Sequence, residues 1–206
     1  ARGNEPIAFR LPSSLSVLEG EQFLEVRLVY NKNHRKYEWH LVIETGIEPR
    51  ISTGTNVAGV DLGEIHPAAI TDGQQSIIIS CRELRSLNQY RNKRFAELKS
   101  LQATKKKQSR RWWRIQRRIN RFLAKNKVQR RDLEHKISRA VVDWSILHQV
   151  GTIVIGDVRD VADGKRLNRK SQQKVSNWSH GQIRKYIAYK AEAEGIVVND
   201  EVNEAY

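Results

Sequence analysis

Residues 57–63 read VAGVDLG, and residues 76–80 read SIIIS. Both are continuous apolar runs, which are typical of strands buried on both faces of a sheet. Residues 67–73, PAAITDG, lie between them and offer a third strand that turns at Asp72-Gly73. The region 57–80 therefore predicts three consecutive strands joined by tight turns.

The segment that follows has the apolar period of helices. Apolar residues recur at three- and four-residue intervals over 82–125 and again over 128–148, which predicts a helical hairpin with a break near residues 126–127. The order is then completed by a strand at 152–158 (TIVIGDV), a polar loop at 159–176, a helix at 180–195 and a strand at 196–202. This is the order of an RNase H-like α/β fold with a mixed sheet, interrupted by a long helical insert at about 82–127.

A smaller β region precedes this sheet. Residues 21–30 and 37–46 alternate in polarity and predict a hairpin, with a further strand possible near Ile7–Leu11. Residues 47–56 are a plausible linker. We therefore expect two domains: the C-terminal part of a small β domain over residues 1–50, and the α/β domain over residues 51–206.

Composition limits the class of protein. The 206 residues, of which 39% are hydrophobic and 29% charged, are enough for one good core or two small ones. No apolar run approaches the ~20 residues that cross a membrane. Cys81 is the only cysteine, so the chain cannot form an internal disulfide or a cysteine-based zinc site. Met is absent even from position 1, which suggests part of a longer polypeptide.

The positive charge is concentrated in one segment. The formal net charge is +14, but residues 82–131 alone carry +17, and their only acids are Glu83 and Glu97. The rest of the chain is close to neutral. A basic block of this size favours a polyanionic partner, most commonly nucleic acid.

Within that block, residues 105–121 read KKKQSRRWWRIQRRINR and contain no acid. On a helix, arginines at these intervals present a stripe to phosphates, and a tryptophan can stack on a base. The alternative is a pair of core tryptophans beside a solvated face, and we keep it for at least one of the two. The predicted nucleic-acid contacts are Lys105, Lys106, Lys107, Arg110, Arg111, Trp112, Arg114, Arg117, Arg118 and Arg121.

Carboxylates near strand ends are candidate metal ligands. Asp61 ends its strand two residues before Gly63, where a phosphate can approach closely. The alternative is an aspartate that bonds its own turn. Asp157 is adjacent to Gly156, so the two positions belong to opposite faces of a strand. The residues alone do not choose among the later acids Asp200, Glu201 and Glu204, and His66 is a further candidate to line the site.

Four motifs together carry a family resemblance. GVDLGEIHPAAITDG, HKISRAVVDWS, TIVIGDVRDVADG and WSHGQIRKYIAYKAEAEGIVVNDEVNEAY occur in order between residues 57 and 206. They resemble the RuvC domain of TnpB proteins, the transposon-encoded, RNA-guided DNA nucleases related to the Fanzors and to type V CRISPR effectors. The upstream hairpin is similar to the end of the family's β-barrel (wedge) domain.

The resemblance implies the catalytic residues. The family's first aspartate corresponds to Asp61, but its usual glutamate stands where this chain has Gly156, a departure that favours an inactive site. One branch of TnpB and the Fanzors carry a relocated glutamate, and VNEAY matches that motif at Glu204. Asp61 and Glu204 are thus the implied catalytic residues and ligands of Mg²⁺ (or Mn²⁺). A zinc ribbon and a third catalytic aspartate follow in the family beyond the position of Tyr206, so we expect no zinc in this chain and little cleavage by it alone.

The resemblance therefore implies a metal-dependent, RNA-guided DNA endonuclease with guide RNA and target DNA as partners. It also implies a cytoplasmic, nucleoid-associated protein, of prokaryotic rather than eukaryotic type, with no membrane partner. Two alternatives stay open: a nuclease-dead, RNA-guided DNA-binding repressor, which Gly156 favours, and a non-catalytic RNA-binding protein, for which the basic segment suffices.

Overall fold

The computed structural model describes residues 13, 23–31, 36–44, 46, 48–52, 54–157 and 168–203. The chain divides into two compact units, Ala1–Ile47 and Glu48–Tyr206. The strand considered near residues 7–11 lies outside the described residues.

The first unit contains the predicted hairpin. Strands β1 (Phe23–Asn31) and β2 (Lys36–Ile43) pair antiparallel. Tyr30 lies opposite Tyr37 with 5.1 Å between the ring centroids, a cross-strand aromatic pair that stabilises the register. The sequence prediction of a hairpin is confirmed, and its membership of a β-barrel stays a prediction.

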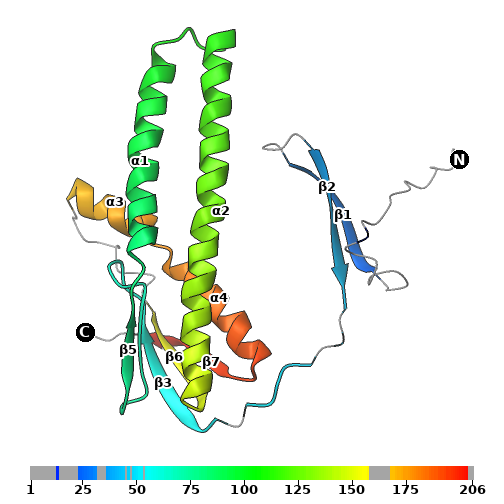
Figure 1. Ribbon diagram of the computed structural model, residues 1–206, viewed down its shortest axis with the longest axis vertical. Coiled ribbons are helices and arrows are strands. Elements are labelled where there is room, and N and C mark those ends of the chain that lie inside the picture. Colours follow the sequence, from blue (N-terminus) through cyan, green and yellow to red (C-terminus); the bar gives the residue numbers. More distant parts are fainter. Residues whose placement is uncertain are drawn as a thin grey trace, which may run out of the picture. The chain divides into compact units, whose positions relative to one another are not determined.

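The second unit is built on a five-stranded mixed sheet with the order β5-β4-β3-β6-β7 (Figure 1). Its first part is the predicted antiparallel run of β3 (Asn56–Asp61), β4 (Ala68–Thr71) and β5 (Ser76–Ile79). Two later strands then add in parallel, β6 (Val150–Asp157) beside β3 and β7 (Val197–Asn203) beside β6. The centre of the sheet is therefore the pair β3–β6.

Two long helices form the insert, but the turn between them is not where the sequence analysis placed it. Helix α1 spans Arg82–Ala103 and helix α2 spans Arg110–Leu147, so the predicted break near residues 126–127 is wrong. Residues 110–147 contain no glycine or proline to end a helix, and the buried Asn126 donates to the Leu87 carbonyl of α1 at 3.5 Å. The chain reverses instead at residues 104–109.

Local chemistry explains the turn that forms. Gln108 adopts a left-handed backbone conformation (φ 64°), and Ser109 caps α2 because its Oγ accepts a hydrogen bond from the Trp112 amide at 3.2 Å. The lysines 105–107 therefore lie in the turn rather than on a helix. No helix in the described part of the chain is long and apolar enough to cross a membrane.

The region between β6 and β7 holds two helices rather than one. Helix α4 (His180–Ala193) matches the predicted helix, and Gly195 follows it with φ +72°. Residues 169–176, predicted as loop, belong instead to the short helix α3 (Arg169–Asn177). Its signal was the N-cap: the Asn168 side chain accepts from the Ser171 amide at 2.9 Å.

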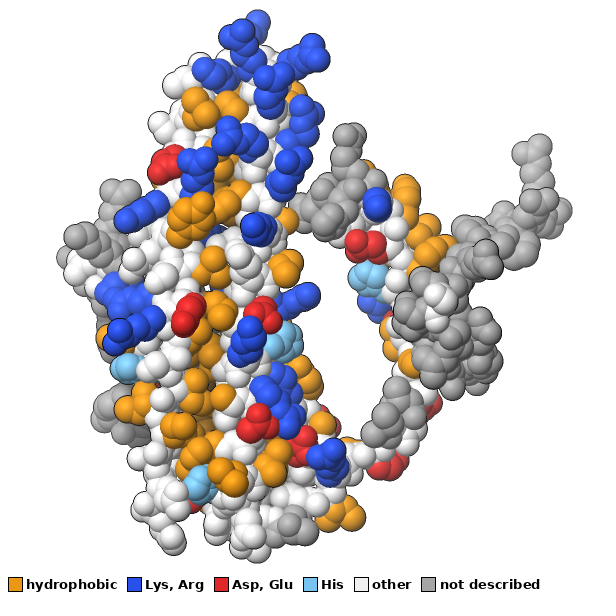
Figure 2. Space-filling view, in the orientation of Figure 1, with side chains coloured by type: hydrophobic (Ala, Val, Ile, Leu, Met, Phe, Trp, Pro, Cys, Tyr) orange, Lys and Arg blue, Asp and Glu red, His pale blue; other side chains and the backbone are white. Residues whose placement is uncertain are grey.

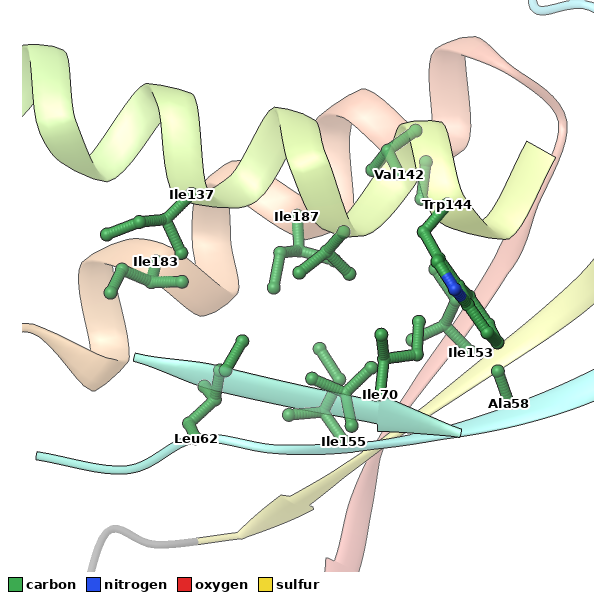
Figure 3. Packing of buried hydrophobic residues seen from close by; sticks show 14 of the residues in the cluster. Ala58, Leu62, Ile70, Ile137, Val142, Trp144, Ile153, Ile155, Ile183 and Ile187 are labelled. Atoms are coloured by element: carbon green, nitrogen blue, oxygen red, sulfur yellow. The ribbon is translucent and has the colours of Figure 1, made fainter. Parts of the chain in front are cut away.

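The core lies between the sheet and helices α2 and α4. Figure 3 shows Ile137 and Trp144 of α2 and Ile183 and Ile187 of α4 directed toward strand residues that include Ala58, Ile70, Ile153 and Ile155. The isoleucines and Ala58 are at most 2% exposed. This contact is the main hydrophobic interface of the unit.

The prediction that these strands are buried on both faces is wrong for the described residues. In β3, Ala58 and Val60 face the core, whereas Val57, Gly59 and Asp61 alternate onto the other side and are exposed. We call this second side the open face. Its apolar residues produced the continuous apolar run in the sequence.

The buried face sets the stability of the unit, which a matched pair on α2 tests. Val141 is fully buried and Val128 is 58% exposed. We expect Val141→Ala to lower the free energy of unfolding by about 2–3 kcal/mol, because it removes buried methyl groups and leaves a cavity. Val128→Ala should change it by less than ~0.5 kcal/mol. Urea unfolding measures both; equal effects would contradict this assignment of the core.

Candidate active site and nucleic-acid interface

Asp61 is the last residue of the central strand β3 and lies on the open face. Its carboxylate makes no hydrogen bond or ion pair with any residue that the structure describes. The turn-bonding alternative for Asp61 is therefore not formed within the described chain. An exposed carboxylate at a strand end is available to a ligand.

Gly156 lies next to Asp61 on the neighbouring strand. The parallel register of β3 and β6 pairs Gly59 with Val154 and Val60 with Ile155, so the next position of each strand is Asp61 and Gly156. Both residues border a hollow of about 490 Å³ on the open face, together with Gly59, Ala69, Thr71 and Val154. The small residues beside Asp61 leave room for a bound group.

A bulge in β7 changes which positions lie alongside this hollow. Val154 is paired with Asn199, but Gly156 is paired with Val202, so β7 has one more residue than β6 over this interval. The backbone register of β7 therefore shifts by one residue between Asn199 and Val202. Glu204 itself lies outside the described residues, as do the side chains of Asp157, Asp200 and Glu201.

The loop after β3 is a tight turn. A Cβ placed on Gly63 would lie 2.7 Å from the His66 carbonyl oxygen, so the turn needs a glycine there. The His66 ring lies 3.2 Å (Nδ1 to Oγ) from Ser80 at the end of β5. The described residues show no contact between His66 and Asp61.

Among the described residues, no three His, Cys, Asp or Glu side chains are grouped as a metal site. This does not oppose magnesium, which is commonly held by one or two carboxylates, with substrate phosphates and water as the other ligands. Asp61 offers the oxygen chemistry that Mg²⁺ prefers, and Gly156 has no side chain to fill the hollow beside it.

The basic segment occupies the distal part of the helical hairpin. Lys and Arg side chains gather over the upper half of α1 and α2 (Figure 2). Arginines 110, 111, 114, 117, 118 and 121 are all exposed on α2, while Lys106 and Lys107 are exposed in the turn and Lys105 is half-buried. The predicted contacts therefore fall into two groups, the turn lysines and the α2 arginines.

The two tryptophans differ in exposure. Trp112, the predicted stacking residue, is half-buried, whereas Trp113 is 47% exposed. Their rings meet edge to face with 4.8 Å between centroids. Exposure therefore favours Trp113 as the stacking surface for a base, with Trp112 as its support.

Two basic residues beside the predicted contacts were not identified by the sequence analysis. Arg94 of α1 and Lys125 of α2 join Arg118 and Arg121 around a hollow of about 280 Å³ over Leu98 and Phe122. Spacing could have identified Lys125, which lies four residues after Arg121 and so on the same helix face. Arg94 could be identified only from the structure, because it comes close to these residues through the pairing of α1 with α2.

Charged groups near the sheet have structural partners. Lys190 of α4 donates to the His135 carbonyl at 2.7 Å and to Ser138 Oγ at 2.8 Å, and burial lowers the Lys190 pKa. His135 stacks on Tyr186 with centroids 3.9 Å apart. His148 stacks on Trp144 at 4.0 Å and follows the last residue of α2. Both histidines therefore pack against aromatic rings of the same unit.

The sheet order and the acidic residue at the end of the central strand define an RNase H-like protein. A family model described as "OrfB_IS605: Probable transposase" matches residues 40–162, more than half of the chain. The chain belongs to this transposase-associated, TnpB-like family. No curated protein matches it.

Solved structures share the fold. A Cas12f1 in complex with sgRNA and target DNA has a TM-score of 0.61 at 18% identity, over 90% of this chain and 37% of that one. A second, a CRISPR-Cas12f ternary complex, has a TM-score of 0.58 at 15% identity, over 93% of this chain and 38% of that one. The chain spans less than two fifths of either structure, and the likeness supports the RNase H-like architecture.

The basic residues around the hollow between α1 and α2 lead to a prediction about the salt dependence of oligonucleotide binding. We expect Arg121→Gln to weaken binding of a duplex oligonucleotide and to reduce the slope of log K against log salt by about one, because one phosphate contact is lost. Lys136→Gln on the same helix is the control, since Lys136 is paired with Asp132 at 2.8 Å. Fluorescence anisotropy over a salt series measures both; equal slopes for the two variants would contradict the assignment.

Proposed function

We propose that this protein is a metal-dependent, RNA-guided DNA endonuclease that cuts target DNA at a RuvC-type site. The observation that carries the proposal is the adjacency of Asp61 and Gly156 on the open face, at the strand ends where the family resemblance locates its two acids. The family match and the fold shared with a Cas12f1 in complex with sgRNA and target DNA support it.

In this proposal Asp61 and Glu204 hold Mg²⁺ or Mn²⁺. Val202 is the β7 partner of Gly156, and Glu204 is two positions further along the sequence. Because strand side chains alternate between the two faces of a sheet, we expect Glu204 to lie on the same face as Gly156 and Glu201 to lie on the opposite face. The bulge in β7 therefore supports Glu204 over Glu201 as the second ligand.

The absence of a side chain at Gly156 then leaves space for the relocated acid. A carboxylate reaching over from β7 needs the space that a side chain on β6 would take, and Gly156 leaves it. A bound metal ion would activate water and stabilise the departing oxygen of the phosphodiester. Asp61 and Glu204 would supply its carboxylate ligands and fix its position on the sheet.

The hairpin would bind the guide RNA or the guide–target duplex. Its exposed α2 arginines and turn lysines are long, flexible phosphate ligands, and no described acid interrupts them between residues 104 and 131. Such contacts read the shape of a duplex, while base pairing with the guide reads the sequence.

A nuclease-dead DNA-binding protein is the second candidate, and Gly156 is the observation that favours it. The two candidates share the guide RNA and the basic hairpin and differ in whether Glu204 replaces the absent acid.

Cleavage of target DNA in Mg²⁺ by the guide-loaded full-length polypeptide, with the third acid that the resemblance implies, separates them. We expect Asp61→Asn and Glu204→Gln to lower the cleavage rate by at least ~100-fold, because each removes a metal ligand, while DNA binding is kept. Glu201→Gln is the matched control and should cleave like the wild type.

A second-site variant tests the relocation directly. Adding Gly156→Glu to Glu204→Gln should restore part of the cleavage, because it returns a carboxylate to the strand end beside Asp61. Cleavage that survives Glu204→Gln would refute the relocated ligand. Guide-dependent binding without cleavage by the wild type would establish the binding protein.

A further inference from the structure

A second cavity lies at the base of the helical hairpin, separate from the hollow on the open face. Its volume is about 450 Å³, within the ~300–1,000 Å³ range of small-molecule sites. Helix α1, helix α3 and the start of α4 enclose it, and it begins at Gly63 and Glu64, two and three residues after Asp61. We call it the hairpin-base cavity.

Four residues that border this cavity each have a buried polar side-chain atom without a hydrogen-bond partner in the described structure. The atoms are Arg85 Nε, Asn88 Oδ1, Trp178 Nε1 and Ser179 Oγ. Ser179 is 8% exposed and precedes α4, yet its hydroxyl does not cap that helix. Arg85 Nε still has an ion-pair partner, Glu64 Oε1, whereas the other three atoms have none among the described residues. Leaving such groups unpaired is costly, so three beside one cavity indicate something that pairs with them.

The identity of the four atoms limits the ligand. Arg85 Nε and Trp178 Nε1 only donate, and the Ser179 hydroxyl can donate or accept. Asn88 Oδ1 is an amide oxygen and only accepts. The amide nitrogen of Asn88 donates to the Asn177 carbonyl at 3.4 Å, which fixes the orientation of the amide. A matching ligand therefore carries acceptors and at least one N–H or O–H donor.

The charge around the cavity is positive. Arg85, Lys93 and Lys174 border it with one acid, Glu64, whose Oε1 lies 3.6 Å from Arg85 Nε. Burial raises the pKa of the Cys81 thiol, so this wall residue stays neutral. Inorganic phosphate suits the cations and can donate through an O–H group, but it has no planar ring to lie against Trp178. A nucleotide combines an anionic phosphate with a planar base that both donates and accepts.

We propose that the hairpin-base cavity binds one nucleotide, with its phosphate toward Arg85 and its base against Trp178, Asn88 and Ser179. Proteins that hold an unstacked base use this combination of an aromatic ring with polar groups on the base edge. The nucleotide is free or is an unpaired residue of a strand. This assignment rests on the proposed function: the nucleotide belongs to the nucleic-acid strand that passes Asp61.

Cys81 provides a local reporter, since it is the only cysteine and lies in the cavity wall. The experiment measures its labelling rate with a small maleimide on the full chain, in EDTA and without guide RNA. The probes are dTMP, a 5′-phosphorylated thymidine pentanucleotide and inorganic phosphate. We expect dTMP, the pentanucleotide or both to slow labelling at least fivefold, and phosphate to have no such effect.

Matched variants tie the protection to the unpaired atoms. Ser179→Ala and Trp178→Phe should raise the nucleotide concentration needed for protection about tenfold, because each removes one buried hydrogen-bonding group. Ser176→Ala, an exposed serine of α3, and Arg82→Gln, an exposed arginine of α1, are controls and should protect like the wild type.

The outcomes separate cleanly. Protection by dTMP supports a site for free nucleotide, and protection by the pentanucleotide alone supports a strand as the source. Equal protection by phosphate would show that the cavity is only an anion site and would overturn the proposal. The proposal would also be overturned if anisotropy shows that the pentanucleotide binds but Cys81 is not protected. Since the assay needs neither metal nor cleavage, a failure of the proposed nuclease would leave its result intact.

Discussion

The one-sided packing of α2 and α4 on the mixed sheet is the contact on which the rest of the unit depends. It buries alternate residues of the central strands, such as Val60 and Ile155, and by the same alternation places Asp61 and Gly156 on the opposite, open face. The candidate active site is therefore a geometric consequence of how the core is covered. A change of one residue in the register of β3 would bury the aspartate.

The same helix joins the core to the basic surface. Helix α2 is continuous over Arg110–Leu147, so its last turns pack on the sheet while its first turns carry arginines, with a small apolar cluster of Leu98, Ile115 and Ile119 holding α1 alongside. A rigid helix transmits position over its whole length. Nucleic acid bound at the arginines would thus be held at a defined distance from Asp61.

The hairpin-base cavity lies where these parts meet. Its walls come from the loop that follows Asp61, from α1 and from α3, which were separate features in the sequence. The polar atoms of Asn88, Trp178 and Ser179 are ordinary on a helix or loop surface. They become a candidate site because packing removes them from water without pairing them.

The sequence alone determined the strands of the sheet, the order of the elements other than α3, the concentration of charge in residues 82–131 and Asp61 as an acid at a strand end. These are local properties, read from period, composition and motif. Tertiary structure decided the place of the hairpin turn, the open face, the adjacency of Asp61 and Gly156, the grouping of Arg94 with Arg121 and the cavity around Ser179. Each of these depends on which distant segments pair and pack, and the periodicity of apolar residues along the sequence does not contain that information.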